Sequence, residues 1–142
     1  MKIAFNHAEL AVPVSQKLMD LLAQLTGNVS DNTTALTFNF RDKSYSAEDG
    51  GYHPVEIRIG KTLQGWQFEY ITDFSYQGYP YAELVKEVDF DFNHKVFSHL
   101  FMSDISLNHV ETKEFYQLWE GNFISYVEMD CFDEIQISKE EG

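Results

Sequence analysis

The stretch that decides the fold is TTALTFNFRD, residues 33–42. Apolar and polar side chains alternate along it, one set on each side of an extended chain: Leu36, Phe38 and Phe40 against Thr37, Asn39 and Arg41. A period of two kept over this length is typical of a β-strand with one buried face and one wet face. The segment therefore predicts a sheet that covers its core from one side only.

The same period returns in four later segments, PVEIRIG (54–60), WQFEYITDF (66–74), LVKEVDFDF (84–92) and FDEIQIS (132–138). We expect Trp66, Phe68 and Tyr70 on the buried face, and an outer acidic stripe of Glu87, Asp89 and Asp91. KVFSHLFM (95–102) is apolar on both sides, which predicts a central or covered strand. Short turn signals separate the runs, so an antiparallel meander of about six strands is expected.

Two segments switch to the helical period. In residues 13–27 the apolar residues recur at helical spacing, with Pro13 in the first turn and Gly27 at the end. Residues 108–127 do the same: Phe115, Leu118, Trp119, Phe123 and Tyr126 mark one face. Asn108 and Glu111 are the expected capping pair, and Gly121 predicts close packing or a kink.

The order of elements predicts the fold class. A helix, five strands, a second helix and a last strand follow one another without a repeat, a linker or a low-complexity tract. We therefore expect one α+β domain over residues 1–142, a twisted antiparallel meander with the two helices packed on one face. The other face, with its Thr, Asn, Arg, Glu and Asp side chains, is wet or binds a partner.

Composition limits the function classes. The chain has 142 residues, with 10 basic against 23 acidic residues and a formal net charge of −13. This charge repels nucleic acid and anionic membranes and attracts cations and basic proteins, although it also serves solubility alone. A single cysteine, Cys131, and the absence of an apolar signal segment at the N-terminus favour a cytoplasmic protein.

The motifs of common catalytic and metal sites are missing. The sequence has no HExxH or CxxC motif, no GxSxG elbow and no phosphate-binding loop. Asp89, Asp91 and Asn93 open like a calcium loop, but the glycine and the closing glutamate of that loop are absent. A distant assembly of His7, His53 and His109 is the remaining metal arrangement. We predict no metal, no cofactor and no catalytic residue.

Two tyrosine-rich loops are the candidate binding site. KSYSAEDGGYHP (43–54) and SYQGYPYAEL (75–84) combine aromatic rings with glycine and proline, as recognition surfaces often do. Pro54 and the two glycines give the first loop a defined shape, and a purely structural His53 is the simpler interpretation. The alternative for the tyrosines is that their rings fold back over the core. The candidate residues are Tyr45, Tyr52, His53, Tyr76, Tyr79, Tyr81, Glu87, Asp89 and Asp91.

Four segments, GGYHPVEI (50–57), YQGYPYAEL (76–84), FDFNHKVF (90–97) and LWEGNFISY (118–126), resemble a small bacterial family of unknown function. Members of that family are often encoded on genomic islands. The resemblance runs from the first helix to the last strand. It identifies the family and names no chemistry.

The resemblance implies a fold similar to that of the mitochondrial glycoprotein family. Those acidic matrix proteins also bind complement globular heads, have a twisted antiparallel sheet flanked by terminal helices, and form a ring-shaped trimer. The present chain is shorter, lacks their long acidic insertions and ends in a predicted strand. Homo-oligomerisation therefore stays open, and likeness of fold alone transfers no function.

Three functions follow. The leading hypothesis is a non-enzymatic interaction protein whose acidic surface steers a basic partner protein and whose tyrosines anchor it. The first alternative is a mimic of nucleic acid that inhibits a basic DNA-binding protein. The second is a small-molecule-binding protein or enzyme that uses the tyrosine and histidine loops. Direct binding of nucleic acid or a membrane is not expected.

Overall fold

The computed structural model describes residues 2–6 and 10–142. Within them the chain forms two helices and seven strands. Their bounds are α1 Gln16–Thr26, β1 Thr33–Arg41, β2 Val55–Thr62, β3 Gly65–Gln77, β4 Glu83–Asp91, β5 Val96–His99, β6 Ile105–Ser106, α2 Val110–Glu128 and β7 Glu134–Glu141. No helix in the described part of the chain is both long and apolar enough to cross a membrane.

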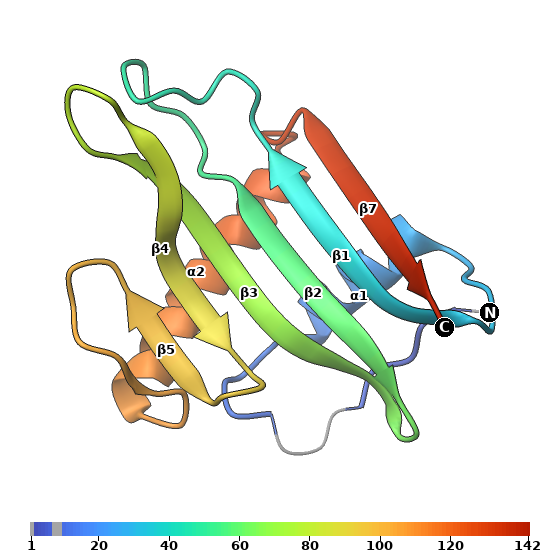
Figure 1. The fold of residues 1–142 in the computed structure, drawn as a ribbon. Coiled ribbons are helices and arrows are strands. Elements are labelled where there is room, and N and C mark those ends of the chain that lie inside the picture. The colour runs from blue at the N-terminus through green and yellow to red at the C-terminus, as the bar shows by residue number, and fades with distance from the viewer. Residues whose placement is uncertain (1, 7–9) are drawn as a thin grey trace.

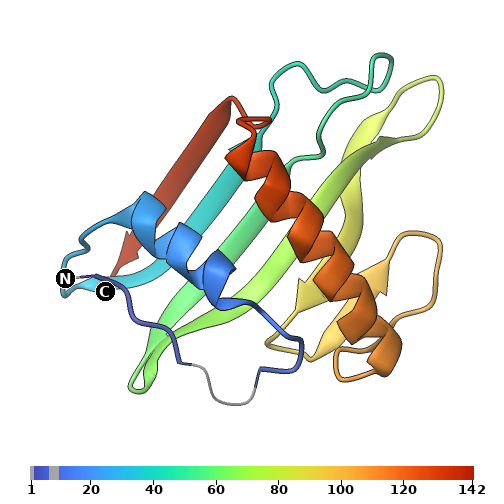
Figure 2. The same cartoon turned by 180° about the vertical axis from the view of Figure 1, so that it is seen from behind.

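The strands form one antiparallel sheet in the order β6-β5-β4-β3-β2-β1-β7. Figures 1 and 2 show the sheet twisted, with both helices on one face and the other face open. This confirms the predicted α+β meander with helices on one side. The sheet has one strand more than expected, because Ile105–Ser106 adds a two-residue edge strand beside β5.

Helix α1 begins later than the sequence suggested. Ser15 is its N-cap, and Oγ of Ser15 accepts the backbone N–H of Leu18 at 3.1 Å. Pro13 therefore lies outside the helix. Gly27 ends it with a φ of 67°, a backbone conformation that glycine adopts readily.

Helix α2 also differs from its prediction. His109, not Asn108, is the N-cap, and its ring Nδ1 accepts the N–H of Glu111. Leu118, expected on the buried face, is 66% exposed. A Cβ built on Gly121 meets no atom within 4 Å, so this glycine is neither closely packed nor needed for space.

The core lies between the sheet and the two helices. Phe90 meets the ring of Tyr116 edge-on at 4.9 Å, and Phe40 meets Phe123 in the same way at 4.9 Å. Burial of each such ring contributes roughly 1.5–3 kcal/mol. These pairs fix α2 across the strands.

The segment after β4 was predicted wrongly. β5 is four residues long and has only the two-residue β6 beyond it, so it is neither central nor covered on both faces. Phe101 and Met102, the end of the apolar run, are exposed.

The sheet has three register shifts, and two of them change where predicted side chains lie. Between β2 and β3, Arg58 pairs with Tyr70 and Ile59 with Phe68, which leaves Glu69 as an extra residue. Tyr70 therefore lies on the open face beside Arg58, and the prediction that it is buried with Phe68 was wrong. Its hydroxyl donates to Glu56 there. The second of these irregularities, between β3 and β4, shapes the candidate site.

Candidate functional site

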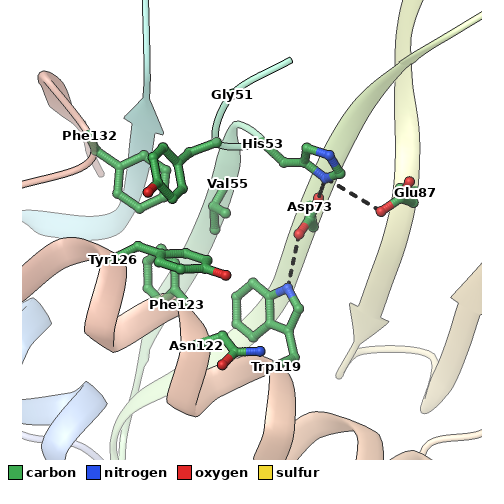
Figure 3. Close-up of a pocket in the computed structure, with 11 residues that line it drawn as sticks. Gly51, His53, Val55, Asp73, Glu87, Trp119, Asn122, Phe123, Tyr126 and Phe132 are labelled. Atoms are coloured by element: carbon green, nitrogen blue, oxygen red, sulfur yellow. Dashed lines mark hydrogen bonds and ion pairs between the residues drawn. The ribbon is translucent and has the colours of Figure 1, made fainter. Parts of the chain in front are cut away.

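A pocket of about 350 Å³ lies where one end of the sheet meets α2. Three connections gather at this end, residues 42–54, 78–82 and 129–133. Figure 3 shows the pocket, with polar groups of the loop and strands at one end and aromatic rings at the other. We call this end of the molecule the tyrosine end.

The loop 42–54 positions His53. Gly50 and Gly51 take φ angles of 71° and 136°, which the turn requires. The Asp42 carboxylate accepts the backbone N–H of Tyr52 and the hydroxyl of Ser44, and these bonds hold the pKa of Asp42 below its usual value. Hydrogen bonds to Asp42, the first residue of the loop, therefore hold the loop in one conformation, in which His53 faces the sheet.

The His53 ring joins two carboxylates from neighbouring strands. Its Nδ1 lies 2.9 Å from Oδ1 of Asp73 in β3 and 3.4 Å from Oε2 of Glu87 in β4. The bond to Asp73 and the negative charges of both carboxylates raise the pKa of His53, although partial burial opposes this. Protonated His53 is the favoured partner of the two acids.

Asp73 lies on the helix-covered face of the sheet. It pairs with Val55 on β2 and Val88 on β4, both buried. A carboxylate on this face needs partners, because removal from water is costly without hydrogen bonds. His53 supplies one, and the indole N–H of Trp119 supplies another, donating to Oδ2 at 3.0 Å.

Glu87 reaches the pocket through the second irregularity. Asp73 pairs with Val88 and Phe74 with Lys86, so Glu87 is the extra residue of β4. An extra residue of this kind redirects a side chain relative to the regular alternation. The predicted stripe is therefore wrong at Glu87, which lines the pocket with His53 and Trp119.

Aromatic rings form the opposite wall. Trp119, Phe123 and Tyr126 project from α2, and Trp119 stacks on Phe123 at 5.1 Å. Tyr52 closes the side, 4.9 Å from Tyr126 and 6.3 Å from Phe132. The pocket thus combines aromatic faces with two carboxylates, an arrangement suited to a cationic group.

His53, Asp73 and Glu87 are also the residues that could hold a metal ion. One ligand atom of each lies within 4.8 Å of the others. The spacing of the histidines did not predict this trio. His109 caps α2, and His7 lies outside the described residues.

The structure brings five of the candidate residues together: Tyr45, Tyr52, His53, Tyr76 and Glu87. Tyr45 lies 5.3 Å from His53 and 5.1 Å from Tyr76, and its hydroxyl accepts the backbone N–H of Tyr76. Tyr52 joins them through the loop. The rings of Tyr45 and Tyr76 pack on one another, whereas Tyr52 packs on Tyr126 and is 37% exposed.

The other candidates separate. Tyr79 and Tyr81 are 97% and 88% exposed at the tip of the β3–β4 connection. Asp89 accepts the hydroxyl of Thr72, and Asp91 bonds to His94, so these two acids lie away from the pocket.

Sequence reasoning missed Asp73, Asn122 and the pocket role of Trp119. Asp73 is the one acid in the segment ITDF (71–74), between Thr72 and Phe74 on a predicted strand, and this is the signal that could have marked it. Trp119 and Tyr126 were assigned to the core face of the helix.

Comparison with known proteins identifies the family. Residues 13–138 match the family described as "Protein of unknown function (DUF2787)". No curated protein matches the chain.

Two solved structures have the same fold. The hypothetical protein VC0508 from the VSP-II pathogenicity island of Vibrio cholerae is 45% identical, with a TM-score of 0.84 over 95% of this chain and 99% of that chain. The conserved hypothetical protein VC1805 from pathogenicity island VPI-2 of Vibrio cholerae O1 is 39% identical, with a TM-score of 0.80 over 90% and 96% of the two chains. VC1805 is described as sharing structural homology with the human P32 protein. The chain therefore belongs to the DUF2787 family, and its fold is similar to that of P32, the mitochondrial glycoprotein.

Proposed function

We propose that this protein is a non-enzymatic interaction protein that binds a basic partner protein at the tyrosine end. The observation that carries the proposal is that an acidic, aromatic pocket lies at the same end of the molecule as two exposed tyrosines. These are Tyr79 and Tyr81, in the connection between β3 and β4. Exposed aromatic rings on a short connection provide binding anchors at low entropic cost, because tyrosine has few rotatable bonds.

The charge of the tyrosine end supports a basic partner. Its connections, residues 42–54, 78–82 and 129–133, contain five acidic residues and one lysine. The connections at the opposite end, residues 27–32, 63–64 and 92–95, contain one acid and one lysine. Among these connections, those beside the pocket carry the larger negative charge, which would steer a positive partner during association.

Affinity capture with site-directed controls tests the proposal. The tagged protein is used to capture partners from its own host at low salt, and the captured protein is then purified and titrated directly. Tyr79→Ala and Tyr81→Ala should each weaken this titration about tenfold, as truncation of an anchoring aromatic does. Both side chains are exposed, so neither variant should alter the fold.

The matched control lies at the far end of the sheet. Leu63 is fully exposed in the β2–β3 turn, roughly 40 Å away along the 13-residue strand β3. Leu63→Ala should leave binding unchanged. Equal effects of all three variants, or binding that does not weaken with salt, would contradict the proposal.

Competition with DNA decides between an adaptor and a nucleic-acid mimic. If the purified partner binds DNA and this protein displaces the DNA in a salt-dependent way, the mimic is correct. If DNA and this protein bind the partner together, the adaptor is correct. In both cases the tyrosine end is the predicted contact.

A further inference from the structure

We propose that the pocket binds the guanidinium group of an arginine side chain presented by the partner. This inference rests on the proposed function and adds to it the chemical group that is recognised. The pocket has a negative end, an aromatic wall and room for one long side chain.

The charge of the pocket favours a cation. Asp73 and Glu87 contribute two negative charges against the single charge of a protonated His53. No lysine or arginine is among the described residues that line the pocket. The site is therefore short of positive charge in either protonation state of His53.

The carboxylates are arranged for a planar, forked donor. A guanidinium presents five N–H groups in one plane and pairs with carboxylates through two bonds at once. Oxygens of Asp73 and Glu87 belong to the trio of ligand atoms that lie within 4.8 Å of one another. One guanidinium can reach both acids from this distance, whereas an ammonium acts as a single point of charge.

The aromatic wall provides the second half of the recognition. Trp119 lies next to the carboxylate end of the pocket, and Tyr126 projects from the same helix farther along the aromatic wall (Figure 3). Guanidinium groups stack on such faces, and the attraction grows where water is excluded. The indole of Trp119 is fixed by its bond to Asp73, so this face is set before the ligand arrives.

The size of the pocket suits a small ligand. Pockets for drug-sized molecules start at roughly 300 Å³ and extend to roughly 1,000 Å³. At about 350 Å³ this pocket is at the small end of that range. One arginine side chain fits within it, while the rest of the partner lies on the tyrosine loops.

Titration with a minimal probe tests the inference. N-acetyl-arginine amide is added to the ¹⁵N-labelled protein, and the indole N–H resonance of Trp119 is followed, assigned by its loss in Trp119→Phe. We expect a saturable shift with a Kd on the order of a millimolar, as befits so small a ligand. The neutral isostere, N-acetyl-citrulline amide, should bind at least about tenfold more weakly.

Two variants locate the probe. Glu87→Gln removes one charge from a half-exposed side chain and should weaken binding several-fold. Asn122 is exposed on α2 at the pocket rim, so Asn122→Arg should fill the pocket from the protein itself and abolish the shift. Gln117→Arg adds the same charge to another face of α2 and should leave probe binding intact.

Three results would overturn the inference. The first is equal binding of the citrulline and arginine probes, and the second is binding that survives Asn122→Arg. The third is a Trp119 shift caused by zinc chloride and lost in His53→Ala, with none caused by arginine, which would assign the trio to a metal. If the tyrosine variants weaken partner binding while Glu87→Gln and Asn122→Arg do not, the proposed function stands and this inference fails.

Discussion

At the scale of single residues, His53 connects a loop, the sheet and α2. Pro54 and the two glycines before it predicted a loop of defined shape, and the structure has one. The partners of His53 were not predictable, because Asp73 and Glu87 follow it by 20 and 34 positions along other strands. The local sequence therefore determines the backbone conformation of the loop, whereas the pairing of β3 with β4 determines which carboxylates lie next to His53.

Replacing His53 by glutamine should change how stability depends on pH. Because Asp73 raises the pKa of His53 in the folded protein, the folded state binds more protons than the unfolded state near neutral pH. This stabilisation is complete below the unfolded pKa of about 6.5 and is lost as pH rises through the folded pKa. Urea unfolding should show the free-energy difference between wild type and His53→Gln shrinking as the pH rises above about 6.5.

Asp73→Asn provides the control for this titration. In that background the carboxylate that raises the pKa of His53 is gone, so His53→Gln should have a smaller effect on the pH dependence. With Asp73 intact, the difference in unfolding free energy between wild type and His53→Gln should change with pH. A difference that stays constant over the whole pH range would contradict the proposed coupling between His53 protonation and folding.

At the scale of elements, the helices and the long strands were predicted, and the phase of two strands was not. The period of two is visible in sequence because each face of a strand meets one environment. An extra residue such as Glu69 or Glu87 becomes visible only against its partner strand. For this reason Tyr70 and Glu87 were assigned to the wrong faces, and Glu87 entered the site by a route that periodicity cannot detect.

Gly121→Ala should stabilise the protein by about 0.5–1 kcal/mol. The glycine lies inside α2, and an added Cβ meets nothing within 4 Å, so only the helix propensity changes. Gly65→Ala is the matched contrast, since φ is 116° there and a Cβ would lie 2.8 Å from the carbonyl oxygen of Ala4. Thermal unfolding should move up for the first variant and down for the second. A loss of stability in Gly121→Ala would instead support the close packing at Gly121 that the sequence predicted.

Tyr116→Phe should destabilise the contact between the two helices. The buried Tyr116 hydroxyl donates to Oε2 of Glu120 at 2.6 Å, and the same oxygen accepts the backbone N–H of Ser15, the N-cap of α1, at 3.0 Å. Removing the hydroxyl keeps the ring on Phe90 but takes one donor from a buried carboxylate. Urea unfolding should show a loss of about 1–3 kcal/mol. Tyr81→Phe, which makes the same change at an exposed ring, should stay within about 0.5 kcal/mol of wild type.

At the scale of the whole molecule, sequence predicted the parts of the site and not their convergence. The loops of the tyrosine end were found from their composition, and the antiparallel meander implies that alternate connections share one end of a sheet. The return of β7 to pair with β1, and the position of α2 beside β3, depend on contacts far apart in the chain. The pocket depends on the second of these, so aromatic residues predicted as core became its wall.

From the net charge we expect salt to have opposite effects on folding and on binding: it should stabilise the folded protein and weaken its binding to a basic partner. At −13 the folded chain repels itself, so added NaCl should raise the thermal midpoint as it shortens the screening length from about 30 Å at 0.01 M to about 10 Å at 0.1 M. The same screening should weaken capture of a basic partner.

Charge variants at the tyrosine end test the assignment. Neutralising the exposed pair with Glu48→Gln and Asp49→Asn should reduce both salt effects, while Lys86→Gln, which adds net negative charge, should increase them. A midpoint that does not rise with salt would mean that local pairs, such as Arg58 with Glu69 and Glu140, already balance the charge. In that case salt-sensitive binding would have to come from the acids beside the pocket rather than from the overall charge, and the double variant would reduce it.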